Sequence, residues 1–176
     1  MKAKRFFSVA AFAAALFAAV SCGDRGVTGV SAQPHPDALL FFGMTSPKLG
    51  LVTCTPQPYD SVTQVVGPEG GTIHVGGFTL LIPDSALDSA VTITAVAPSD
   101  TINDVRFQPA GLHFNQKASL TIGYANCGIV GWLLPQHIAY TDDSLNIIDF
   151  IPSVPNVLTQ TVTGSIRHFS EYALAW

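Results

Sequence analysis

The sequence predicts an all-β fold, an antiparallel β-sandwich over residues 61–176, and three observations lead to this prediction. From residue 61 onward, short segments alternate apolar and polar residues, as strands with one buried face do. Turns rich in Gly and Pro separate these segments, and the chain holds 15 Gly and 12 Pro. No apolar period of helical length occurs among them, so a layered β domain is expected.

The size and composition of the chain exclude several classes of protein. The chain has 176 residues, which is enough for one domain. Only 11% of the residues are charged, whereas an ordinary soluble domain has about 25%. These values exclude a disordered chain dominated by charge, a coiled coil and a large multidomain enzyme.

The first 21 residues have the organisation of an export signal. Lys2, Lys4 and Arg5 form a basic start, and an apolar segment covers residues 6–20. This segment is shorter than the about 20 residues that a membrane-spanning helix needs. A basic start followed by a short apolar run is typical of a secretory signal peptide, so we expect export.

The end of the signal, residues 19–23, resembles the lipobox of bacterial lipoproteins, in which small residues precede a Cys. Ala19 departs from the commoner Leu of that motif. The resemblance implies that Cys22 is diacylated and becomes the N-terminus of a stably membrane-anchored chain. Gly23 stands where an Asp would retain the protein in the inner membrane, so the expected location is the cell envelope, at the outer membrane.

Removal of the signal leaves five basic against twelve acidic residues, a net charge of about −7. The remaining basic residues are scattered along the chain. Binding to a phosphate backbone requires clustered Lys and Arg, so nucleic acid is excluded as a partner.

Residues 22–60 are interpreted as an irregular tether between the anchor and the domain, because they show no sustained hydrophobic period. Five prolines interrupt this segment: Pro34, Pro36, Pro47, Pro56 and Pro58. The apolar run Leu39-Leu40-Phe41-Phe42 is the exception. Two interpretations of this run stay open: it docks on the domain as an edge strand, or it contacts a partner.

The strands of the sandwich are expected at residues 62–66, 72–75, 78–82, 91–97, 120–124, 138–141, 145–151, 157–164 and 165–176. Gly76-Gly77 forms a two-residue hairpin turn between the second and third strands. Pro83 ends the third strand, because it has no N–H for the ladder. Leu120 and Ile122 occupy alternate positions and therefore share one face, which we expect to point inward.

Three blocks of this region resemble the ZU-5 domain, which zonula occludens proteins, Unc-5 netrin receptors and ankyrins share. The first block is Gly70-Gly71-Thr72 followed by residues 78–87, with Ser85 where the family usually has Gly. The second block is residues 107–114, with a Pro-Gly turn, followed by a strand that includes residues 118–122.

The third block is the closing strand, residues 168–174. Together the blocks cover residues 61–176, apart from an untypical stretch between Cys127 and Gln136. The resemblance implies a β-sandwich used chiefly for protein–protein contacts and scaffolding, without a cofactor. We therefore expect an interaction or structural role, with an unidentified envelope protein as partner and no catalytic turnover.

Cys54 and Cys127 remain as a pair once Cys22 is assigned to lipid. Oxidation is expected in an exported chain, so we expect a disulfide between them. The alternative is two free buried thiols. A zinc site has less support, because no Cys-x-x-Cys or His spacing accompanies the pair.

The other polar residues show no pattern of a metal or catalytic site. The His residues, which lack metallopeptidase spacing, are His35, His74, His113, His137 and His168. Asp142-Asp143 and the loop with Asp100 and Asp104 fit turn chemistry better than calcium binding. No nucleophile elbow or phosphate loop occurs. A secreted hydrolase or a small-ligand binder stays an alternative that a deep polar pocket would favour.

The triplet His168-Phe169-Ser170 suggests a second alternative. In death-domain and inflammasome-sensor relatives of the ZU-5 fold, a His-Phe-Ser in the closing strand cleaves itself, with Ser as nucleophile and His as base. The resemblance implies autoproteolysis at the Phe169–Ser170 bond. His168 and Ser170 lie two apart, on one face of a strand, as a nucleophile and its base require. The competing interpretation is that both are ordinary residues of the closing strand.

Overall fold

The computed structural model describes residues 50–128, 133 and 136–176, which include the strands given below and a short 3-10 helix, η2 (Ala125–Cys127). The strands are β1 (Asp60–Val66), β2 (Gly71–Val75), β3 (Phe78–Ile82), β4 (Val91–Ala97), β5 (Asp104–Gln108), β6 (His113–Gly123), β7 (His137–Thr141), β8 (Ile147–Ile151), β9 (Ser153–Asn156), β10 (Thr161–His168) and β11 (Glu171–Ala175).

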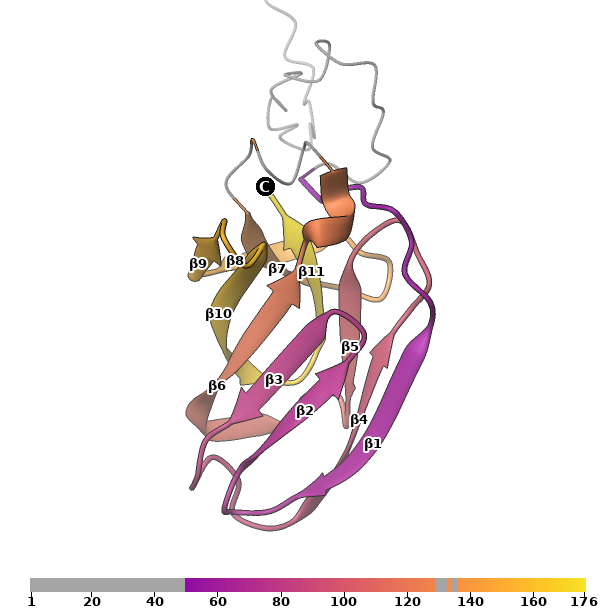
Figure 1. The fold of residues 1–176 in the computed structure, drawn as a ribbon. Helices are drawn as coiled ribbons and strands as arrows, with labels where there is room; N and C mark the ends of the chain where they lie inside the picture. The colour runs from indigo at the N-terminus through magenta and orange to yellow at the C-terminus, as the bar shows by residue number, and fades with distance from the viewer. Residues whose placement is uncertain (1–49, 129–132, 134–135) are drawn as a thin grey trace, which may run out of the picture. The chain divides into compact units, whose positions relative to one another are not determined.

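Two antiparallel sheets pack as a sandwich, which confirms the predicted fold class. One sheet has the strand order β1-β4-β5-β11-β7-β8, and the other has the order β2-β3-β6-β10-β9. Figure 1 shows β2, β3 and β6 in front of β4 and β5. Side chains from both sheets fill the core between them, among them Leu80, Phe107, Leu120, Ile122 and Tyr172. Burial of such side chains contributes about 1.5–3 kcal/mol each.

Several strands have the predicted bounds or differ from them by a residue. β3 and β4 match the prediction, and Val75 pairs with Phe78 across the predicted Gly76-Gly77 turn. β5 and β9 were not predicted. β5 carries charged residues at Asp104 and Arg106, which obscure the apolar alternation of a strand that is half buried.

The predicted strand at residues 157–164 is shifted. Residues 157–160 form the turn between β9 and β10, and β10 continues to His168. The Asn156 carboxamide oxygen accepts hydrogen bonds from the N–H groups of Leu158 and Thr159, at 3.0 and 3.2 Å, and so closes this turn. The apolar residues that favoured a strand, Val157 and Leu158, are exposed instead.

Residues 50–59 belong to the packed domain, although the sequence suggested a tether. Leu51 and Val52 are buried, and the Val52 N–H donates to the Leu174 carbonyl at 3.1 Å. The Trp176 N–H donates to the Gly50 carbonyl at 3.0 Å. Two buried apolar residues among prolines and polar residues make too short a pattern to indicate packing.

Three predictions concern parts of the chain outside the described residues: the signal over residues 1–21, the lipid site Cys22 and the run Leu39-Leu40-Phe41-Phe42. In the part of the chain that the structure describes, no helix has the length and apolarity to cross a membrane.

Ser85 occupies a turn conformation that suits glycine. Its φ is +58°, a left-handed conformation that costs a residue with a side chain about 1 kcal/mol. Its N–H donates to the Pro68 carbonyl at 2.7 Å, a bond that glycine would keep. We expect Ser85→Gly to raise the free energy of unfolding by up to about 1 kcal/mol in urea denaturation. Ser61→Gly in β1 is the control and should lower it, because glycine weakens a strand.

Candidate functional site

The structure joins Cys54 and Cys127 by a disulfide, as predicted. Their Cα atoms lie 4.0 Å apart, and both side chains are buried. The bridge connects residues 50–59, which we name the entry segment, to η2, and the Thr55 N–H donates to the Asn126 carbonyl beside it at 2.9 Å. Its role is therefore structural: it fixes the start of the domain to the end of β6.

The predicted closing strand at residues 165–176 is divided in the structure: His168 ends β10, and Phe169 and Ser170 carry the chain across to β11 in the other sheet. His168 and Ser170 therefore do not share one face of a strand. The Phe169 ring is buried in the core. It stacks on Phe107 with ring centroids 5.2 Å apart and meets Phe114 edge-on at 5.0 Å. This packing fixes the position of the Phe169–Ser170 peptide bond.

Two hydrogen-bonding groups face the Phe169 carbonyl. The Gly111 N–H donates to its oxygen at 3.0 Å, and His168 Nδ1 lies 3.5 Å from the same oxygen. Gly111 belongs to the Pro-Gly turn of the second sequence block and has a φ of +75°. This turn and the triplet are therefore neighbours in the fold, although 58 positions separate Gly111 from Phe169 in the numbering.

The His168 ring packs among aromatic rings. Its centroid lies 5.0 Å from that of Tyr140, 5.6 Å from His113 and 6.2 Å from Tyr172. The buried Tyr172 hydroxyl donates to the His168 carbonyl at 2.7 Å, and burial raises the pKa of Tyr172 above its ordinary range. No hydrogen bond joins the His168 ring to the Ser170 hydroxyl in this described turn. The arrangement polarises the carbonyl but does not pair the base with the nucleophile.

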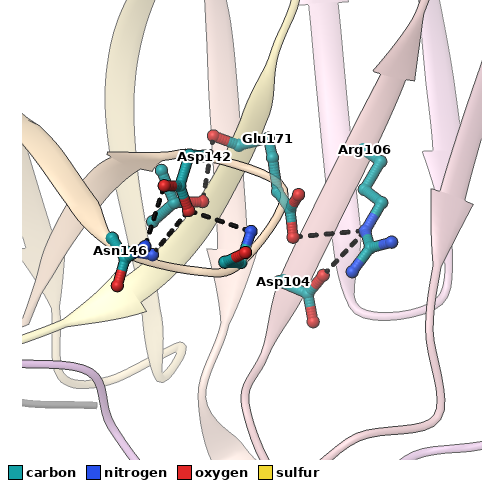
Figure 2. Close-up of polar contacts among 7 residues, drawn as sticks. Asp104, Arg106, Asp142, Asn146 and Glu171 are labelled. Carbon is teal, nitrogen blue, oxygen red and sulfur yellow. Dashed lines mark hydrogen bonds and ion pairs between the residues drawn. The ribbon is translucent and has the colours of Figure 1, made fainter.

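A buried carboxyl pair that the sequence did not suggest lies on neighbouring strands. Asp104 of β5 and Glu171 of β11 are 1% and 4% exposed. Arg106 Nε lies 3.5 Å from Asp104 Oδ2 and 3.2 Å from Glu171 Oε1. Figure 2 shows the Arg106 guanidinium facing both carboxyl groups. No local sequence pattern could reveal this pair, because it depends on the register between two strands far apart in the chain.

Burial dominates the acid–base behaviour of this pair. Loss of solvation raises the pKa of Glu171 to about 7; Arg106 opposes the shift, and the neighbouring Asp104 adds to it. Burial also raises the pKa of Asp104, against the opposing effects of Glu171 and Arg106. One cation thus faces two carboxyl groups, and a single proton on the pair relieves their mutual repulsion.

The neighbouring turn contains the predicted Asp142-Asp143. Asp142 Oδ1 accepts hydrogen bonds from the backbone N–H groups of Ser144 and Asn146, both at 2.9 Å. Asp142 Oδ2 accepts another from Asn146 Nδ2 at 2.8 Å, as Figure 2 shows. These are the turn bonds expected of Asp. Among the residues that the structure describes, no group of three or more His, Cys, Asp or Glu side chains could hold a metal.

A hollow of about 10 Å³ lies at the β2–β3 turn, with Gln57, Gly76, Asp100 and Asn103 among its lining residues. This volume has room for about one water molecule. The hollow does not provide the deep polar pocket that a hydrolase or small-ligand binder would need.

Exposed apolar side chains gather toward the C-terminal part of the domain. Seven of the ten large exposed apolar residues in the described chain lie there: Leu133, Ile148, Phe150, Val154, Val157, Leu158 and Trp176. Three of them lie on β8 and β9, which end the two sheets on this side. Concentrated apolar exposure is typical of surfaces that bind another molecule.

The chain matches no protein-family model and no curated protein.

Proposed function

We propose that the protein is a lipid-anchored lipoprotein of the cell envelope whose ZU-5-like β-sandwich binds another envelope protein. The observation that carries the interaction role is the apolar edge strand β8. It pairs with β7 on one side, and within the described residues no strand pairs with its other side. It exposes Ile148 and Phe150, so it offers both backbone groups and apolar side chains to a partner.

The chemistry of β8 indicates the kind of partner. The Asp149 carboxylate accepts the Phe150 N–H at 2.8 Å, which satisfies an edge donor in the free protein. An extended apolar segment of a partner could replace this contact and add a strand to the sheet. β9, the edge of the other sheet, is less suited because Pro155 has no N–H for a ladder.

Photocrosslinking on intact cells tests this proposal. A photoreactive side chain in place of Phe150 is expected to trap one discrete envelope protein. The same group in place of Val65 is the control, because Val65 is exposed on β1, the opposite edge of the same sheet. Ile148→Asp in the chain labelled at Phe150 should abolish the product. Equal products from the two labelled positions, or none from either, would contradict an interaction through β8.

Autoproteolysis at Phe169–Ser170 is a second candidate, favoured by the two groups at the Phe169 carbonyl. In this reaction the Ser170 hydroxyl attacks that carbonyl carbon while His168 takes the hydroxyl proton. The C–N bond breaks and the Ser170 nitrogen leaves as an amine after accepting a proton. Water then hydrolyses the ester, which restores the Ser170 hydroxyl and leaves a carboxylate on Phe169. The Gly111 N–H would stabilise the oxyanion.

The intact mass of the folded, exported chain tests whether the Phe169–Ser170 bond is cleaved. Cleavage would give two fragments that separate only on denaturation, because β11 pairs with β5 and β7. Ser170→Ala should then give a single uncut chain, whereas Ser165→Ala in β10 should still be cut. A wild-type chain that keeps its full mass after prolonged incubation at neutral pH would eliminate this candidate.

A further inference from the structure

We propose that one end of the sandwich contacts the lipid surface directly, through Leu133, Val157, Leu158 and Trp176, which we name the apolar end surface. This inference rests on the proposed lipid anchor and adds an orientation to it. The four side chains are 76%, 63%, 93% and 39% exposed.

Strand pairing places these residues at the same end. The start of β7 pairs with the end of β11, since His137 lies opposite Ala175. The start of β10 pairs with the end of β6, since Thr161 lies opposite Gly123. Leu133 precedes β7, Val157 and Leu158 precede β10, and Trp176 follows β11.

The disulfide and nearby hydrogen bonds hold the two sheets together at this end. Cys54, in the entry segment beside β11, is bonded to Cys127 of η2, which follows β6. The Tyr124 N–H donates to the Gln160 carbonyl at 2.8 Å, so the β9–β10 turn lies next to η2. In Figure 1, η2 and the C-terminus lie at the same end of the sandwich.

The charge distribution favours lipid at this end. None of the described residues 50–59, 124–128, 133, 136, 157–160 and 174–176 is Asp, Glu, Lys or Arg. The nearest carboxylates, Asp60 and Asp100, lie to one side, where the Asp60 carboxylate accepts the Gly76 N–H and the Asp100 carboxylate accepts the Thr101 N–H. The opposite end, at the β1–β2 and β3–β4 connections, carries Glu69, Asp84 and Asp88, and the exposed basic residues Lys117 and Arg167 lie toward it on β6 and β10. Because the segments that carry the apolar end surface hold no charge, they can enter the interface without the cost of burying one.

The kind of structure at this end distinguishes lipid from a protein partner. The apolar side chains project from a turn, a connection and a chain segment after β11, and not from an edge strand such as β8. They therefore offer apolar tips without a row of backbone groups for strand pairing. Shallow insertion of Leu and Trp side chains into the interface requires no such row. The tether also joins the domain here, at Gly50, beside Trp176.

Vesicle binding by the mature chain with Cys22→Ser tests the surface without the anchor. We expect this protein to co-sediment with phosphatidylcholine vesicles, and Leu158→Asp to weaken its partitioning at least about tenfold, because one buried Leu side chain is lost from the contact. Leu81→Asp is the matched control, since Leu81 is also exposed but lies on β3. It should have no effect. Adding phosphatidylglycerol should not strengthen binding.

A second measurement uses the lipidated protein in vesicles of brominated phosphatidylcholine. Bromine in the acyl chains should quench the fluorescence that Trp176→Phe removes, and Leu158→Asp should relieve this quenching. Unquenched Trp176 in the anchored protein, or equal binding of the Leu158→Asp and Leu81→Asp chains, would overturn the proposal. A mature chain whose mass lacks acyl groups at Cys22 would refute the anchor, while the binding of the Cys22→Ser chain would still decide the contact.

Discussion

Removing the disulfide is expected to lower the free energy of unfolding by about 4 kcal/mol, because the bridge closes a long loop and restricts the unfolded chain. Its two ends are 73 positions apart in the sequence. A double Cys54→Ala, Cys127→Ala chain should therefore unfold at a much lower urea concentration than the oxidised protein. Part of this lost free energy should come from the entry segment. Its residues Leu51 and Val52 are buried, and the bridge holds them in place against the rest of the domain.

The reduced wild-type protein is the control for this measurement. It should unfold at nearly the same urea concentration as the double variant, since both lack the cross-link but keep the same fold. The disulfide would be energetically unimportant if reduction left the midpoint of the oxidised protein unchanged.

Stability is expected to fall as the pH rises from about 4.5 to above 7, because of Glu171. Its pKa is raised from 4.5 to about 7 in the folded protein. The folded chain therefore keeps a proton that the unfolded chain has already released. The stabilisation is complete below pH 4.5 and is lost as the pH passes through 7. The full shift corresponds to about 3 kcal/mol.

The Glu171→Gln variant isolates the contribution of this carboxyl group to the pH dependence of the free energy of unfolding. The variant keeps the size of the side chain and removes the proton loss, so it should be more stable than wild type at about pH 8, by up to about 3 kcal/mol. At about pH 4 the two proteins should be nearly equal. Asp149→Asn, which removes an exposed carboxylate of β8, should leave the pH dependence unchanged. A wild-type stability that rises from about pH 5 to about pH 8 would contradict this origin.

Local sequence patterns predicted the strands that alternate cleanly and missed those that do not. β3 has Phe78, Leu80 and Ile82 at alternate positions, β4 likewise has Ile93, Ala95 and Ala97, and clear turns bound both strands, so their bounds were predicted correctly. β6 begins at His113 although only Phe114 is buried among its first five residues, so its first half shows no alternation. The Cys pair could be predicted because the sequence predicts export, and exported chains usually oxidise paired thiols.

Glycine and turn positions in the first sequence block have a physical basis in the structure. Gly70 has a φ of +73°, and a Cβ at this position would collide with the Ile82 carbonyl. Ser85 has a positive φ at the position where the sequence block suggested Gly. The carboxyl pair and the apolar end surface, in contrast, arise from contacts between distant strands and loops. No spacing along the chain predicts them.

The position of the disulfide determines how the domain would respond to a pull on its tether. In the proposed lipid-anchored chain, force from the membrane side would enter at Gly50 and would first load the few hydrogen bonds that join residues 50–53 to Leu174 and Trp176. These bonds can open one after another, but unzipping stops at Cys54, where a covalent bond passes the load to Cys127. β1 and the rest of the sandwich would thereby be shielded from tension that starts at the proposed anchor. The bridge acts as a mechanical stop for a domain held at one end.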